Sequence, residues 1–323
     1  MPMLDMPIER LRTYQGQNPK PADFDAFWDN ELEKIHAFNG AYEIIDTEFS
    51  TKNVKVEDLF FTAPDGSRIH AKIARPAAEG KYPTVFLFHG KGGNLGASKS
   101  LLSWVSEGFV AASIDCRSQA GLSNDATERG LLGQSGLIVR GLSKGRDYLY
   151  YKDVFLDVVR LVDIVKAQPY CDVDRLYARG GSQGGALTLV CAALCPEIKA
   201  IAPIVPFLCD YKRLYEMDQM ERAYSEIKDY VRYACPIDDE NRAKMWETLG
   251  YIDVQHLAPR IKAETLWFVG LMDNICPPST QFAAYNKITA KKEIVVYTNH
   301  GHETPWEIDD RFFLFLTRHE SVK

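Results

Sequence analysis

One six-residue turn limits what this chain can fold into more than any other stretch of its sequence. Residues 180–185 read Gly-Gly-Ser-Gln-Gly-Gly, between a short extended run and an apolar run of helical length. The chain must therefore turn sharply from a strand into a helix. A serine flanked as in Gly180-Gly-Ser182-Gln-Gly184 is typical of the nucleophile elbow, which holds the serine hydroxyl above a sheet in a strained backbone conformation. We therefore expect Ser182 to be a nucleophile.

A glycine-rich turn from strand to helix can also hold a phosphate group, so the two patterns must be told apart. A P-loop requires Gly-Lys followed by serine or threonine, and this does not occur after the turn. Ser182 and Gln183 also occupy positions where the dinucleotide-binding pattern needs glycine. The sequence thus argues against a phosphate site. A tight turn with a serine that performs no chemistry stays open at this point.

Strand and helix patterns alternate along most of the chain. Continuous apolar runs are typical of strands buried on both faces of a sheet, and apolar residues at helical spacing predict an amphipathic helix over 153–168. This alternation predicts an α/β fold, the α/β-hydrolase fold, with a mostly parallel, doubly wound sheet that binds ligands beyond the carboxyl ends of its strands. The buried strands expected besides the one before the turn are 84–88, 109–115, 200–207, 265–271 and 293–297.

The other segments are expected to decorate this sheet within a single domain over residues 1–323. Residues 1–42 form an N-terminal helical extension with an amphipathic helix over 21–38. Alternating residues within 43–75 predict strands that enter the sheet antiparallel. The segment 208–263 is too long for a simple crossover and too amphipathic for disorder, so it predicts a helical insertion over the carboxyl edge.

Composition excludes several kinds of partner. The chain has 46% apolar residues, enough for a large core, and a formal charge of −6 that leaves no basic patch for nucleic acid or a membrane surface. Acids and prolines interrupt the first ten residues, so neither a signal peptide nor a membrane span is expected. Seven cysteines without framework spacing indicate reduced thiols, and hence a cytoplasmic protein. No cofactor or metal is expected, since Cys191 and Cys195 fit core packing better than a metal pair.

A nucleophilic serine needs a base, and the base needs a group that fixes its tautomer. In α/β-hydrolases these partners follow in the order serine, acid, histidine, on loops after later strands. Asp273 and His302 stand in that order, each just past an expected strand. Asp210 is the rival acid, and Asp273 could instead cap a helix; His300 is the rival base. We predict that Ser182, Asp273 and His302 act together.

The segment His89-Gly-Lys91-Gly-Gly93 follows another expected strand and is similar to loops that give one main-chain donor to an oxyanion hole. We expect the Lys91 N–H to be that donor and the Gln183 N–H to be the second one. Because the donors are main chain, the lysine side chain is not required for this role. His89 could serve only to fix the loop by hydrogen bonding.

Characteristic residues occur in Asp23-Phe-Asp-Ala-Phe-Trp28, residues 150–160, Gly180–Gly185, Val205-Pro-Phe-Leu-Cys209, Gly270–Thr280 and His302-Glu303. In these segments the sequence resembles carbohydrate esterase family 7, the acetyl xylan esterases and cephalosporin C deacetylases. The resemblance covers nearly the whole chain and implies the triad Ser182, Asp273 and His302, small acetate esters as substrates, and a homo-oligomer, the family's ring-shaped hexamer. It implies a serine esterase that deacetylates xylo-oligosaccharides or cephalosporin C-like acetates through an acetyl-enzyme. A peptidase or longer-chain esterase on the same fold, or a non-catalytic binding protein, are the alternatives.

The sequence departs from this family at two positions. The family's usual Arg-Gly-Gln is Arg117-Ser118-Gln119 here, and a tyrosine that usually follows His-Gly is replaced by Lys91. Replacing an aromatic platform with a flexible cation is expected to change how a substrate ring rests at the entrance. The preference for leaving groups is therefore expected to differ.

Overall fold

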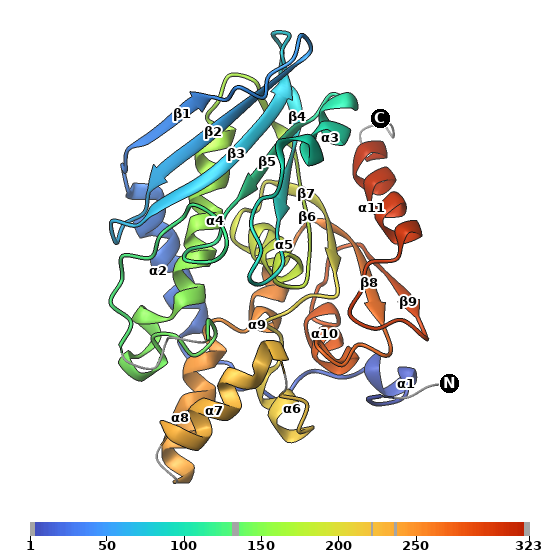
Figure 1. Cartoon of the computed structure of the whole chain (residues 1–323). Helices are drawn as coiled ribbons and strands as arrows, with labels where there is room; N and C mark the ends of the chain where they lie inside the picture. Colours follow the sequence, from blue (N-terminus) through green and yellow to red (C-terminus); the bar gives the residue numbers. More distant parts are fainter. Residues whose placement is uncertain (1–3, 131–135, 221, 236–237, 320–323) are drawn as a thin grey trace.

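A nine-stranded sheet forms the centre of the described chain, in the order β1-β2-β3-β5-β4-β6-β7-β8-β9 (Figure 1). The structure is a computed structural model that describes residues 4–130, 136–220, 222–235 and 238–319. The strands are β1 (Tyr42–Asp46), β2 (Val54–Thr62), β3 (Arg68–Pro76), β4 (Tyr82–Phe88), β5 (Val110–Ile114), β6 (Cys171–Gly181), β7 (Ile198–Ile204), β8 (Glu264–Gly270) and β9 (Lys292–Tyr297).

The sheet is antiparallel at one edge and parallel elsewhere. β1, β2, β3 and β5 pair antiparallel in sequence, whereas β5, β4 and β6 to β9 pair in parallel. The chain thus begins with an antiparallel entry and winds both ways from β4, which confirms the predicted α/β-hydrolase fold. The carboxyl ends of β4, β6, β8 and β9 consequently meet at one edge, where the predicted site residues follow them.

Helices cover both faces of the sheet. One apolar core contains side chains from α2, α4, α5, α9 and α10, and the other contains side chains from α3 and α11, so strand residues alternate between two cores.

No helix among the described residues has both the length and the apolar character needed to cross a bilayer. The helices are α1 (Ile8–Leu11), α2 (Phe24–Ala37), α3 (Leu102–Ser106), α4 (Tyr150–Lys166), α5 (Gln183–Leu194), α6 (Tyr211–Glu216), α7 (Ser225–Tyr233), α8 (Asp239–Gly250), α9 (Val254–Leu257), α10 (Pro278–Tyr285) and α11 (Trp306–Arg318).

The helices α6, α7, α8 and α9 all lie between β7 and β8 in the chain. Figure 1 shows α6, α7 and α8 together at the lower end of the molecule. On α8, the Asp238 side chain accepts the Asn241 N–H and so caps the helix at its first turn. Trp246 and Leu249 of the same helix are buried, so this segment contributes to the core.

The N-terminal segment is fixed to the middle of the chain by one buried carboxylate. Asp210 is fully buried, and its side chain accepts hydrogen bonds from the Tyr14 hydroxyl at 2.7 Å and from the Gln17 and Asn18 N–H groups at 3.0 and 2.8 Å. Farther along, the Trp28 indole N–H donates to the Tyr251 carbonyl at 3.0 Å. The first part of the chain is therefore packed against the segment that precedes β8.

Candidate active site

Ser182 lies in the sharp turn between β6 and α5, with φ 57° and ψ −118°. This left-handed backbone is strained for any residue with a side chain, and it is typical of a nucleophile elbow. The absence of a side chain at Gly184 makes the turn possible, because a Cβ atom there would lie 2.0 Å from the Phe88 carbonyl oxygen. The glycines thus let β4 and α5 approach each other while Ser182 is held at the carboxyl edge.

The structure brings the three residues predicted from the order of the chain into contact. The Ser182 Oγ lies 2.9 Å from His302 Nε2, and His302 Nδ1 lies 2.8 Å from Asp273 Oδ2. Asp273 is fully buried and the His302 side chain is 21% exposed. Since an ionised carboxylate only accepts, Nδ1 donates to Asp273 and Nε2 is left to accept the serine proton. This arrangement can activate the hydroxyl by general-base chemistry.

The Asp273 carboxylate is oriented by its own loop. Oδ1 accepts the Ile275 and Cys276 N–H groups at 2.9 and 2.8 Å, and Oδ2 also receives the Gln281 side-chain amide at 3.3 Å. The helix α10 begins later, at Pro278, and no side chain caps its start. Asp273 is therefore not the cap of this helix, and its second oxygen faces His302.

The loop that carries His302 sits on the end of β8. A Cβ atom at Gly270 would lie 2.3 Å from the His300 carbonyl oxygen, and that carbonyl accepts the Met272 N–H at 2.9 Å. The rival His300 ring packs edge-on against Tyr297 at a centroid distance of 4.9 Å. The rival acid Asp210 binds the N-terminal segment instead. Gly270 was not singled out for this role from the sequence, although it directly precedes the loop of Asp273.

The loop over residues 89–93 is fixed by side chains at both ends. His89 Nε2 accepts the Cys116 N–H at 3.0 Å, so Nδ1 carries the proton and donates to the Gly90 carbonyl at 2.7 Å. Burial lowers the pKa of His89 and keeps its ring neutral. At the other end, the Gly92 N–H donates to the Gln119 side-chain carbonyl at 2.7 Å. His89 thus fixes the loop, and Gln119 was missed as its second anchor.

The Gln183 side chain joins this loop to the elbow. It is fully buried, and its carbonyl accepts the Tyr151 hydroxyl at 2.8 Å and the Gln119 side-chain N–H at 2.9 Å. Its own amide N–H donates to the Gln119 side-chain carbonyl at 3.3 Å. The Gln183 N–H lies in the first turn of α5, where no intrahelical acceptor exists. Within the described parts of the chain, the Lys91 N–H also has no hydrogen-bond acceptor. Both expected donors are therefore without an acceptor among the described residues, as an oxyanion hole requires.

The Lys91 side chain is held in an ion pair, so the expectation of a flexible cation is wrong, whereas the expected change in leaving-group preference stays a prediction. Its Nζ donates to Glu226 Oε1 at 2.6 Å and to the Ala223 carbonyl at 2.8 Å, and it lies 5.6 Å from the centre of the Phe207 ring. Ala223 lies just before α7 and Glu226 lies within it. The sequence pattern does not predict the contact of Lys91 with either residue.

The backbone conformation of Ser118 explains why the family that the sequence resembles usually has glycine at this position. Its φ of 47° is in the left-handed region, which glycine adopts without steric cost. The preceding Arg117 is buried and donates to both oxygens of Asp157 at 2.5 and 2.8 Å. This bidentate pair orients the turn that carries Gln119.

One group of possible metal ligands coincides with the hydrogen-bonded residues. The ligand atoms of Asp273, Cys276 and His302 lie within 4.8 Å of one another. Burial and the charge of Asp273 raise the pKa of the Cys276 thiol well above its usual value, so the thiolate that a metal needs is disfavoured. The geometry between Asp273 and His302 is that of a hydrogen bond.

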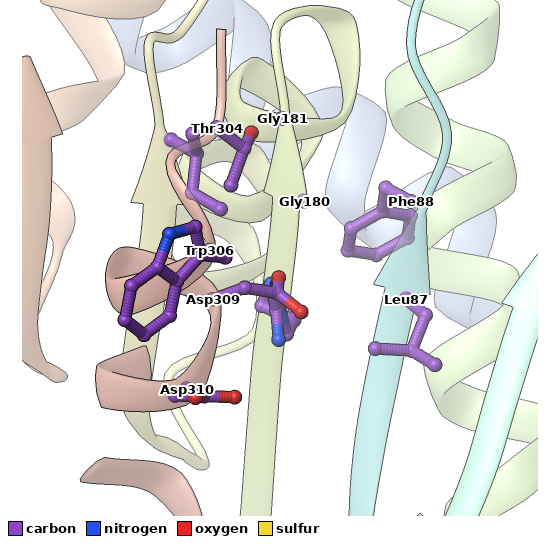
Figure 2. Close-up of a pocket in the computed structure, with 10 residues that line it drawn as sticks. Leu87, Phe88, Gly180, Gly181, Thr304, Trp306, Asp309 and Asp310 are labelled. Carbon is purple, nitrogen blue, oxygen red and sulfur yellow. Dashed lines mark hydrogen bonds and ion pairs between the residues drawn. The ribbon is translucent and has the colours of Figure 1, made fainter. Parts of the chain in front are cut away.

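A hollow of about 490 Å³ borders the elbow strand. Figure 2 shows Trp306 and Asp310 of α11 on one side of Gly180 and Phe88 of β4 on the other. The Trp306 side chain is 74% exposed. The residues that line this hollow include Gly180 and Gly181 but neither Ser182 nor His302, so it lies beside the site without holding its reactive atoms.

Comparisons with known proteins place this geometry in a family. The family model described as acetyl xylan esterase (AXE1) matches residues 1–319. Acetyl esterase Axe7A of Xylanibacter ruminicola is 27% identical over 319 residues, which cover 96% of this chain and 69% of that protein.

Two solved structures are similar over nearly their whole length. Acetyl xylan esterase 1 from Thermoanaerobacterium sp. JW/SL YS485 has a TM-score of 0.92 and 41% identity, covering 97% of this chain and 99% of that one. The acetyl xylan esterase from Paenibacillus sp. R4 has a TM-score of 0.90 and 34% identity, covering 96% and 99%. Since the family model spans almost every residue, the chain belongs to the acetyl xylan esterase (AXE1) family.

Proposed function

We propose that this protein is a serine esterase that removes acetyl groups from small acetylated compounds. One observation carries the proposal: the continuous hydrogen-bonded chain from Ser182 Oγ through His302 to the buried Asp273. Membership of the acetyl xylan esterase family supports acetate as the acyl group. Acetylated xylo-oligosaccharides are the first substrates to test, and cephalosporin C-like acetates are the second.

In the proposed reaction, His302 takes the Ser182 proton as Oγ attacks the acetyl carbonyl. The N–H groups of Gln183 and Lys91 hold the negative oxygen of the tetrahedral intermediate. Asp273 stabilises the imidazolium, which then protonates the departing alcohol. Water attacks the acetyl-enzyme with His302 again as base, which releases acetate and restores the serine.

The replacement Ser182→Ala tests the nucleophile. We expect kcat for p-nitrophenyl acetate to fall by on the order of 10⁵-fold or more, because no acetyl-enzyme can form. The thermal unfolding midpoint should not fall, because the hydrogen bond to His302 is the side-chain contact that the substitution removes. An unchanged kcat would remove Ser182 from the mechanism.

The acyl group is tested with p-nitrophenyl esters of increasing chain length. A steep fall in kcat/KM from acetate to butyrate supports deacetylation, whereas equal or higher rates on octanoate contradict it. Cleavage of aminoacyl amides would indicate a peptidase instead. Acetate release from acetylated xylo-oligosaccharides and cephalosporin C, measured side by side, then identifies the preferred alcohol.

We further propose that the protein assembles as a homo-oligomer in a reducing compartment, the cytoplasm. The resemblance supports a hexamer, and the seven cysteines, all of them free thiols, support the compartment. Light scattering on the purified protein would give the mass of the assembly. A monomer at micromolar concentration would contradict the first part.

A further inference from the structure

A single carboxylate joins three segments at the edge of the site. Glu226 lies in the first turn of α7 and is 6% exposed. One of its oxygens accepts the Lys91 ammonium at 2.6 Å, and the other accepts the Ile138 and Val139 N–H groups at 2.6 and 3.1 Å. A Cβ atom at Gly136 would lie 2.3 Å from that second oxygen, so the segment is fitted closely around the carboxylate.

The other member of this contact is the residue that carries an oxyanion donor. Lys91 follows β4 in the loop that His89 and Gln119 fix from either side, at Gly90 and Gly92. The Gly93 N–H closes the turn by donating to the Gly90 carbonyl at 3.0 Å, and the Lys91 side chain adds a third anchor by reaching Glu226 and the Ala223 carbonyl. The Lys91 side chain therefore links this loop to α7.

We propose that Glu226 is a positioning residue for the oxyanion hole. Through the Lys91 side chain it sets the direction of the Lys91 N–H, so the helical segment before β8 controls stabilisation of the transition state. This inference rests on the proposed esterase function. The charge-assisted hydrogen bond holds the loop only while the ammonium and the carboxylate are both present.

The effect belongs to the transition state and not to substrate binding. An oxyanion exists only after attack on the carbonyl, so a displaced N–H leaves the ground-state complex nearly unchanged. Loss of one whole oxyanion donor costs about 10²–10³-fold in kcat, and a displaced donor costs less. We expect about a 10- to 100-fold loss of kcat with KM within about threefold of the wild type.

Three variants test the proposal. Lys91→Met removes the ammonium and leaves the main-chain N–H, and Glu226→Gln keeps the shape of the side chain. Each should lower kcat and kcat/KM for p-nitrophenyl acetate by the same factor. The double variant Lys91→Met/Glu226→Gln removes both charges, so it should regain thermal stability lost by either single change without regaining kcat. If the single variants lost activity only because they unfold, the double variant would regain kcat together with its thermal stability.

The chain offers a matched control on the same helix. Lys228 of α7 forms an exposed ion pair with Asp218 at 3.3 Å. Lys228→Met should leave kcat within about twofold, because exposed pairs contribute little. Lys91→Arg, which keeps the charge, should retain more activity than Lys91→Met.

The results separate this inference from the function on which it rests. If the wild type hydrolyses acetate esters, Ser182→Ala does not, and Lys91→Met and Glu226→Gln keep wild-type kcat, the role of Glu226 is refuted and the esterase function stands. A raised KM with unchanged kcat would refute it equally, since that result indicates substrate binding. A wild type without esterase activity would overturn both.

Discussion

The two sides of the site are held in different ways. The acid–base side, Asp273 and His302, is fixed largely by main-chain groups near it in the sequence, such as the Ile275 and Cys276 N–H groups. The oxyanion side, the loop 89–93 with Gln183, is fixed by side chains from distant segments. Among these are Gln119, Tyr151 and Glu226.

This difference predicts how each side responds to change. On the acid–base side, replacing a reactive group removes chemistry and leaves the geometry intact. On the oxyanion side, replacing a residue that never touches substrate changes the geometry of the donors. The two histidines differ in the same sense, since His302 must gain and lose a proton while His89 must stay neutral.

Of the two sides compared, the acid–base side is expected to show the larger effect. Asp273→Asn should lower kcat for p-nitrophenyl acetate by about 10⁴-fold, because an amide favours the wrong tautomer of His302 and does not stabilise its cation. Circular dichroism and the thermal midpoint should show a folded protein. A kcat within tenfold of the wild type would mean that another group orients the histidine.

On the oxyanion side, Gln119→Met should lower kcat by about 10- to 100-fold, because the Gly92 N–H loses its acceptor and the loop shifts. KM for the same ester should change little. Asn94→Ala is the matched control, since Asn94 is exposed and its side chain bonds the Ala120 carbonyl at 3.2 Å and the Gly96 N–H at 2.9 Å but not Gly92. Equal losses in both variants would contradict a specific role for Gln119.

The neutral histidine gives a prediction about pH. His89→Ala should lower the free energy of unfolding by about 1–3 kcal/mol at pH 8, through two lost hydrogen bonds. Because burial lowers the pKa of His89 below 6.5, the unfolded chain binds a proton more readily as the pH falls below that value. The stability difference between the wild type and the variant should therefore shrink from pH 8 to pH 5 in urea titrations. A constant or growing difference would show that the ring is not held neutral.

The smallest effect concerns backbone strain beside Gln119. Ser118→Gly should raise the free energy of unfolding by about 0.5–1 kcal/mol, because glycine adopts the left-handed φ of 47° without strain and loses only part of this gain in chain entropy. Ser106→Gly, at the end of α3, should have the opposite sign. Denaturant midpoints measured in parallel would decide between these outcomes.

The same contrast explains what the sequence could predict. Buried strands and the Ser182 turn have strong local patterns, and the order serine, acid, histidine indicates Asp273 and His302 once the strands are found. Glu226 has no such pattern, because a glutamate on an amphipathic helix is usually solvated and its partner is 135 residues away. Lys91 was misjudged for the same reason: its residue type suggests a flexible cation, and only the packing of α7 shows the fixed ammonium.

Through their hydrogen bonds to the Asp210 carboxylate, the first twenty residues support the packing of the rest of the molecule. Shortening the chain to begin after Asn18 would remove all three of these hydrogen-bond donors from the Asp210 side chain, which is fully buried in the intact chain. A hydrogen bond of this kind contributes about 0.5–1.5 kcal/mol, so three lost bonds are a large share of the stability of an ordinary domain. This truncation is therefore expected to loosen α6, which begins at Tyr211 directly after Asp210.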